Sequence, residues 1–198
     1  LFRSSSTSNK LNLVLWTNYD GGSLGKITHN GTLTTNGGHV WIGGSASAGA
    51  SDTWNGLTVG NSGVKASVSS NILATYLAGS ISTGGGDFSV RSSATTSAVG
   101  GGGWVEGILF ENHSLSTGAG RISITGSASG SPGLTSGVEI RGSTISSSSG
   151  NISISGTGSA SSGTVYGLYT QSSGSISSTS GTLALTGSAR GGTATDIS

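Results

Sequence analysis

The chain has 198 residues, of which 38 are glycine and none is cysteine, and its formal net charge is +1. Charged residues make up only 8% of the chain, which is very low for a compact helical or α/β domain. The small net charge argues against nucleic acid or anionic membranes as partners, and the lack of cysteine excludes disulfides, thiolate metal sites and thiol catalysis.

Residues 1–37 are predicted to form the opening turns of a repeating β structure. Leu33 is the single apolar residue of a Ser/Thr-rich run, and it lies five residues before Gly38. The same offset links Ile81 to Gly86. Because this offset recurs along the chain, we expect a short strand before each of these glycines.

Residues 38–119 are predicted to continue the repeat with insertions. The segments 45–55 and 61–78 interrupt the pattern, and we expect them to be loops. Trp41 lies between Val40 and Ile42, whose side chains should point inward, so the Trp41 ring should point outward. We expect one of the loops to cover it.

Residues 120–198 carry the most regular repeat. Three heptapeptides, GRISITG, GNISISG and GTLALTG, recur with a period of about 30 residues, and a second strand recurs in phase with them. The heptapeptides start at Gly120, Gly150 and Gly181, and the second strand starts at Gly107, Gly137 and Gly167, with an earlier relative at Gly56. A period of this length is typical of a chain that coils and stacks each turn on the last.

We therefore predict an all-β protein, a parallel β-helix (β-solenoid) with three short strands in each turn of about 30 residues. We interpret residues 1–198 as a single segment of a longer chain or filament. Alternation along each strand places apolar residues in interior columns. The predicted columns are Val40, Phe88, Ile122, Ile152, Leu183 with Ile42, Val90, Ile124, Ile154, Leu185; Leu57, Ile108, Val138, Leu168 with Val59, Phe110, Ile140, Thr170; and Leu33, Ile81, Leu115, Ile145, Ile176.

The stretches LNLVLWTN at 11–18 and GTLTTNGGHVWIGG at 31–44, together with the recurring GNISISG pattern, resemble a known family. They are similar to the passengers of large two-partner-secreted exoproteins, the filamentous-haemagglutinin-like adhesins. The resemblance implies a right-handed parallel β-helix and export through a partner pore to the cell surface of a Gram-negative bacterium, or secretion from it. It also implies a role in adhesion or in a surface fibre.

The third strand of each turn predicts a ladder of hydroxyl groups. Its two residues beside the inward apolar residue should point outward and stack on those of neighbouring turns. Such a two-wide ribbon is a candidate contact face for ice, for sugars or for another surface. Its members are Thr32, Thr34, Ser80, Ser82, Ser114, Ser116, Thr144, Ser146, Ser175 and Ser177.

Two pairs of opposite charges should stack on neighbouring turns. Alignment of the turns places Asp87 beside Arg121 and Glu111 beside Arg141. We interpret both pairs as surface salt bridges between turns, worth up to about 1 kcal/mol each.

Trp104, Glu106 and Glu111 form the one cluster in the sequence that combines an aromatic ring with two carboxylates. A glycosidase needs two such carboxylates flanking the scissile bond, one of them with a raised pKa. Against this hypothesis, Glu106 is expected just outside its strand, and Glu111 already has Arg141 as a partner.

No cofactor or metal site is predicted. His29, His39 and His113 fall on different segments, and the calcium-binding nonapeptide of β-rolls is missing. No apolar stretch reaches the length of a membrane span.

These patterns predict a structural and adhesive segment of an exported bacterial surface protein or filament, with no enzymatic activity. Expected partners are further turns of the same kind, from the same chain or a second copy, and surface glycans or a host receptor. An ice-binding or glycan-binding module is the alternative, and a polysaccharide-cleaving enzyme ranks third.

Overall fold

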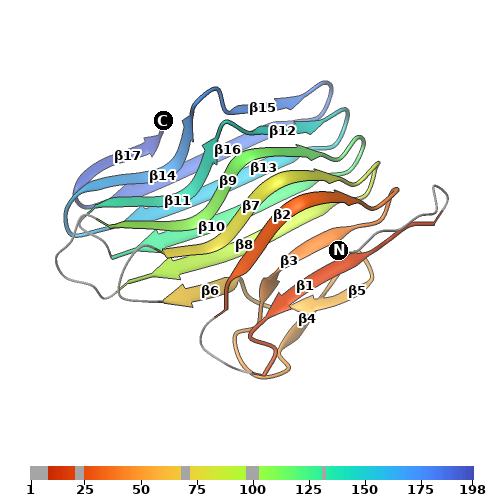
Figure 1. The fold of residues 1–198 in the computed structure, drawn as a ribbon, viewed down its shortest axis with the longest axis horizontal. Helices are drawn as coiled ribbons and strands as arrows, with labels where there is room; N and C mark the ends of the chain where they lie inside the picture. Colours follow the sequence, from red (N-terminus) through yellow and green to blue (C-terminus); the bar gives the residue numbers. More distant parts are fainter. Residues whose placement is uncertain (1–8, 21–24, 68–71, 97–102, 131–132) are drawn as a thin grey trace.

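The computed structural model describes residues 9–20, 25–67, 72–96, 103–130 and 133–198. In these ranges all regular secondary structure is β-strand, and parallel strands stack into a solenoid of about five turns with about 31 residues per turn. Figure 1 shows the turns stacked in chain order, from the red and orange strands to the blue ones. The prediction of an all-β parallel solenoid is confirmed.

Two parallel sheets form the walls of the solenoid. Sheet A contains β1 (Leu13–Thr17), β3 (Val40–Gly44), β6 (Val64–Ser67), β8 (Phe88–Thr95), β10 (Ile122–Ser129), β13 (Ile152–Ser159) and β16 (Leu183–Arg190). Sheet B contains β2 (Ile27–Thr34), β7 (Ile72–Ser82), β9 (Trp104–Ser116), β11 (Leu134–Arg141), β12 (Thr144–Ser147), β14 (Thr164–Gln171), β15 (Ser175–Ser178) and β17 (Thr193–Ile197).

The second and third predicted strands join into one strand in the earlier turns. β9 runs from Trp104 to Ser116 through a bend at Asn112, whose φ is 47°, and β7 is equally continuous. In the later turns the bend separates β11 from β12 at Gly142. The three-strand prediction therefore holds for the later turns. In the earlier ones a single strand continues around the corner, with a register shift between β7 and β9 that leaves Asn112 without a paired residue.

Most of the predicted columns form the core. The register places Phe88, Ile122, Ile152 and Leu183 in one line, and Leu33, Ile81, Leu115, Ile145 and Ile176 in another. The assignment of Leu57 and Val59 to the second pair of columns is wrong. Thr75 and Leu77 of β7 occupy those positions, beside Ile108 and Phe110.

Leu57 and Val59 belong instead to an inserted hairpin, β4 (Ser51–Trp54) and β5 (Leu57–Gly60). The insertion interrupts a strand of sheet A, because β3 pairs with the first half of β8 and β6 with its second half. Only the first of the two expected loops, 45–55, matches this insertion. Even there the expected loop contains β4, and the expected loop at 61–78 is wrong because it contains β6 and the start of β7.

The hairpin lies over Trp41, which is 2% exposed although its ring points out of the solenoid. Val59 and Trp54 line the same small cavity as Trp41, and the ring of Trp16 packs edge-on against it. The prediction that a loop covers Trp41 is confirmed. The insertion thus shields a ring that would otherwise face solvent.

Glycines bring the two sheets into backbone contact. A Cβ atom added at Gly156 would lie 1.9 Å from the carbonyl oxygen of Gly167, and one at Gly126 would lie 2.2 Å from that of Gly137. In an earlier turn, Ser92 of sheet A occupies the equivalent place and accepts a 2.9 Å hydrogen bond from Thr75 of sheet B. The interior is therefore thinnest at the phased glycines.

A column of buried hydroxyls lines the corner that leads from sheet B to sheet A. Thr35 and Thr117 each donate to the carbonyl oxygen of the glycine three residues later, at 2.7 Å, and Thr83 makes the same contact. Ser147 and Ser178 continue the column on later turns. These bonds satisfy carbonyl groups that the turn would otherwise leave unpaired.

Candidate functional site

The outer face of sheet B carries the site with the richest chemistry. In β9, Gly107 and Ile108 both point inward, and the register skips the equivalent Gly137 of β11. Because two successive residues point inward, the alternation of inward and outward side chains shifts by one residue from Ile108 onward. Trp104, Glu106, Leu109 and Glu111 therefore all line one outward cavity.

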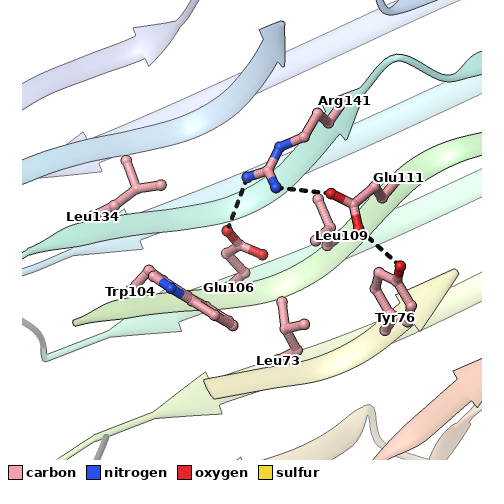
Figure 2. Close-up of a pocket in the computed structure, with 8 residues that line it drawn as sticks. All are labelled: Leu73, Tyr76, Trp104, Glu106, Leu109, Glu111, Leu134 and Arg141. Carbon is pink, nitrogen blue, oxygen red and sulfur yellow. Dashed lines mark hydrogen bonds and ion pairs between the residues drawn. The ribbon is translucent and has the colours of Figure 1, made fainter. Parts of the chain in front are cut away.

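The cavity has a volume of about 280 Å³. Three neighbouring strands supply its walls, and Figure 2 shows the carboxyl groups of Glu106 and Glu111 facing the guanidinium of Arg141. The lining residues are Leu73 and Tyr76 from β7; Trp104, Glu106, Leu109 and Glu111 from β9; and Leu134 and Arg141 from β11. The site thus combines two aromatic rings, three leucines, two carboxyl groups and one cation.

Arg141 is the centre of the polar network. Its Nε and Nη2 donate to Oε1 of Glu139 at 2.9 and 2.6 Å, and its Nη1 donates to Oε1 of Glu111 at 3.0 Å. Its Nη2 also lies 3.8 Å from Oε1 of Glu106. Several charge-assisted contacts of this kind hold a guanidinium in one orientation.

Glu106 and Glu139 are a buried pair of carboxyl groups, 2% and 0% exposed. Their Oε2 atoms receive no hydrogen bond from any conventional donor in the described structure. Burial, and then the charge of Glu139 and a hydrogen bond with it, raise the pKa of Glu106 to about 9. We infer that Glu106 holds a proton at neutral pH, since burial and the neighbouring charge both disfavour its ionised form.

Glu111 has the opposite environment. Tyr76 donates its hydroxyl to Oε2 of Glu111 at 2.8 Å. This hydrogen bond, together with the hydrogen bond and the charge of Arg141, lowers the pKa of Glu111, and the contact with Glu111 raises the pKa of Tyr76. One pocket therefore holds a protonated acid and an ionised carboxylate side by side along β9.

The next turn extends this face with further aromatic and polar groups. The rings of Tyr166 and Tyr169 stack with their centroids 4.2 Å apart and an interplanar angle of 8°. Gln171 donates to Oε1 of Glu139 at 2.5 Å. The polar network therefore spans four turns, from Tyr76 of β7 to Gln171 of β14.

The predicted cluster of Trp104, Glu106 and Glu111 is brought together, with one correction. Glu106 was expected outside its strand, yet it lies inside β9, which begins at Trp104. The inward-facing residues Gly107 and Ile108 then turn the following side chains outward again, toward the same cavity. The structure thereby meets one glycosidase criterion, a carboxyl group with a raised pKa beside an ionised one.

One of the two predicted salt bridges forms. Glu111 pairs with Arg141 at 3.0 Å, as part of the larger network. For Asp87 and Arg121 the prediction is wrong: Oδ1 of Asp87 accepts from the backbone N–H of Arg121 at 2.7 Å, and its Oδ2 accepts from Asn55 at 2.8 Å. Among the described residues, every ion pair involves Arg141. Asp87 and Arg121 do lie on neighbouring turns as predicted. Asp87, however, bonds to the backbone N–H of Arg121 and not to its guanidinium group.

The predicted hydroxyl ladder is present as two columns. The register aligns Thr32, Ser80, Ser114, Thr144 and Ser175 in one line and Thr34, Ser82, Ser116, Ser146 and Ser177 in the other. Some members bond to each other between turns, such as Ser80 to Thr32 at 3.3 Å. Bonds within the ladder use hydroxyl groups that a bound surface would otherwise contact.

The histidines are less scattered than their sequence positions suggest. The rings of His29 and His113 meet edge-on with centroids 5.9 Å apart, whereas His39 packs on Trp54. Burial lowers the pKa of His113 to about 4. In the described part of the chain, no group of three His, Cys, Asp or Glu residues is placed to hold a metal ion.

Sequence reasoning missed Glu139, Tyr76 and Gln171 as members of the site. A signal was present, because the turn alignment places Leu109, Glu139 and Tyr169 in one outward column and Glu111, Arg141 and Gln171 in the next. A carboxylate in the middle of the apolar run Val138-Glu139-Ile140 is the feature that points to it.

The fold and the site define a parallel β-solenoid with an acidic and aromatic pocket on its outer face. Comparison of the chain with protein-family models, curated proteins and solved structures found no match. No helix in the described ranges is both long and apolar enough to cross a membrane.

Proposed function

We propose that this chain is a structural and adhesive segment of an exported bacterial surface protein, and that it contacts carbohydrate through the pocket around Arg141. In this proposal the stacked turns of the solenoid form a rigid rod, and the pocket binds the carbohydrate. The observation that carries the proposal is the pocket itself. It is an outward cavity in which the partly exposed ring of Trp104 lies near the carboxyl groups of Glu106 and Glu111 and the guanidinium of Arg141.

The rod is supported by the continuity of the core columns. Each turn rests on the previous one through main-chain hydrogen bonds and a shared line of aliphatic side chains. At the last turn, Leu183 and Ile197 occupy column positions and are 43% and 50% exposed. A further turn, from the same chain or from a second copy, would bury them.

The carbohydrate contact is supported by the composition of the pocket. Aromatic faces pack against the apolar faces of sugar rings, while carboxylates and guanidinium groups bond to hydroxyls. Trp104 and Tyr76 border the cavity on either side of Glu106 and Glu111 (Figure 2). The hydroxyl ladder, in contrast, uses some of its groups internally and replaces threonine by serine on most turns, which favours the pocket over ice binding.

The test is a screen of immobilised glycans with the purified chain, followed by titration of any glycan that binds. Trp104→Ala should weaken binding by about tenfold to a hundredfold, because one aromatic stacking contact is lost. Tyr19→Ala is the matched control, since Tyr19 is exposed but lies outside the pocket. No binding to any glycan, or an equal loss in both variants, would overturn the carbohydrate contact.

Polysaccharide cleavage is the second candidate, favoured by the opposite pKa shifts of Glu106 and Glu111 in one pocket. Here Glu106 would protonate the leaving oxygen while Glu111 activates a water molecule. The same glycans, incubated with the chain, would then release reducing ends, and Glu106→Gln would abolish the release. Binding without release supports adhesion.

A further inference from the structure

We infer that the pocket around Arg141 takes uncharged sugars and excludes sugars that carry a carboxylate. The inference rests on the proposed carbohydrate contact and adds the class of ligand. It follows from how the single cation of the pocket is used and from the charges that surround it.

Three of the five N–H donors of Arg141, including both donors of its Nε–Nη2 edge, already bond to residues of the chain. A guanidinium recognises a carboxylate through two parallel N–H donors on one edge. In this structure Nε and Nη2 both point at Oε1 of Glu139, and Nη1 points at Oε1 of Glu111. An incoming carboxylate would have to displace a residue of the chain before it could bind in this way.

The displaced residue would then be a buried anion without a partner. Glu139 is fully buried, and besides Arg141 only Gln171 donates a hydrogen bond to it in the described structure. Removing one partner of a buried ion pair is strongly unfavourable. The network therefore holds Arg141 in place and sets its charge against those of Glu111 and Glu139, although the Arg141 side chain is 33% exposed.

The remaining groups also repel an anion. Glu111 and Glu139 accept ion-pair contacts from the same cation, so their two negative charges outnumber its one positive charge. Glu106 contributes a protonated acid and adds no positive charge. The titratable neighbours on the adjacent strands, Tyr76 and Tyr169, both have raised pKa values and stay neutral.

An uncharged sugar is not repelled by the carboxylates and does not need to displace one of them from Arg141. Its ring can lie against Trp104 and the leucines of the lining, and its hydroxyls can donate to the carboxylate oxygens at the mouth. Glu111 is 30% exposed on its side chain, so it remains reachable from solvent while bound to Arg141. The pocket thus provides hydrogen-bond acceptors and an apolar wall.

The experiment compares matched oligosaccharides that differ in one group, a neutral hexose oligomer and its uronic acid counterpart, at pH 7 and low salt. The unmodified chain should bind the neutral oligomer at least about tenfold more tightly, from like-charge repulsion at this range. Glu139→Gln removes one negative charge and the ion pair that holds two donors of Arg141, so the preference for the neutral oligomer should become smaller or reverse. Glu111→Gln does the same for the third donor and serves if Glu139→Gln fails to fold.

Asp87→Asn is the control, because it removes a carboxylate outside the pocket and should leave the preference intact. Equal binding of both oligomers by the unmodified chain, or an unchanged preference in both pocket variants, would overturn the inference while leaving the carbohydrate contact standing. Binding of neither oligomer, with no other glycan bound in the screen, would instead overturn the proposed function.

Discussion

At the scale of single residues, the protein places a carboxylic acid where a charge is costly. Glu106 points outward from β9 yet is 98% removed from solvent, because Trp104, Leu109 and the neighbouring strands cover it. Its nearest partners are the second carboxyl group of Glu139 and a guanidinium that is already engaged. The residue is therefore most stable in its protonated form.

This environment predicts a pH-dependent stability. The pKa of Glu106 is raised from 4.5 to about 9, so the folded state keeps a proton that the unfolded state releases. The free energy of unfolding should fall as pH rises from about 4.5 toward 9, by at most about 1.4 kcal/mol per pH unit from this group. The side chain that the variant Glu106→Gln carries at this position cannot ionise. In urea unfolding at pH 5, 7 and 8, the free energy of unfolding of the variant should therefore rise relative to that of the unmodified chain as the pH increases. Parallel pH profiles for the two proteins would contradict the prediction.

At the scale of strands and sheets, glycine decides how closely sheets A and B approach. The glycines of the heptapeptides look like turn residues in the sequence, yet Gly126 and Gly156 lie inside β10 and β13. They face Gly137 and Gly167 of sheet B across the thin interior. A side chain at any of these positions would meet main-chain atoms, which cannot rotate away.

Gly156→Ala should therefore destabilise the solenoid by about 1 to 3 kcal/mol, the usual cost of overpacking a core. The comparison is Ser153→Ala in the same strand, whose side chain points to solvent and whose loss should cost less than about 0.5 kcal/mol. Thermal or urea unfolding measures both. Equal stabilities would show that the sheets separate easily at this point.

At the scale of the whole molecule, continuous apolar columns run along the solenoid. Leu13 and Leu15 of β1 stand in register with the columns that lead to Leu183 and Leu185 of β16. One terminal strand could therefore stack on the other from a second copy and continue both columns. Such head-to-tail contacts generate filaments, because the interface does not close.

We predict that the isolated 198-residue chain forms fibres with an axial repeat of roughly 24 Å, which is about five turns at a strand spacing of about 4.8 Å. Electron microscopy with Fourier analysis measures this repeat. Leu183→Lys should abolish the fibres by placing a charge in the column, whereas Ser153→Lys adds the same charge to the lateral face and should preserve them. Discrete particles of the unmodified chain at every concentration would rule out self-stacking.

The sequence by itself determined the period, the parallel stacking and most of the core, because alternation within a strand and repetition between turns are local properties. It also placed Glu111 beside Arg141 correctly, since residues at the same phase of the repeat must be neighbours. Where the repeat broke, at 45–78, the same reasoning failed and assigned Leu57 and Val59 to the wrong structure.

Only the tertiary structure decided the pocket and its charges. The two successive inward residues at Gly107 and Ile108 set which side chains face the cavity, and no spacing in the sequence marks that irregularity. The proton on Glu106 depends on its burial and on Glu139 from the next turn. Both effects arise because folding removes water from groups that are distant in the chain, which a linear pattern cannot record.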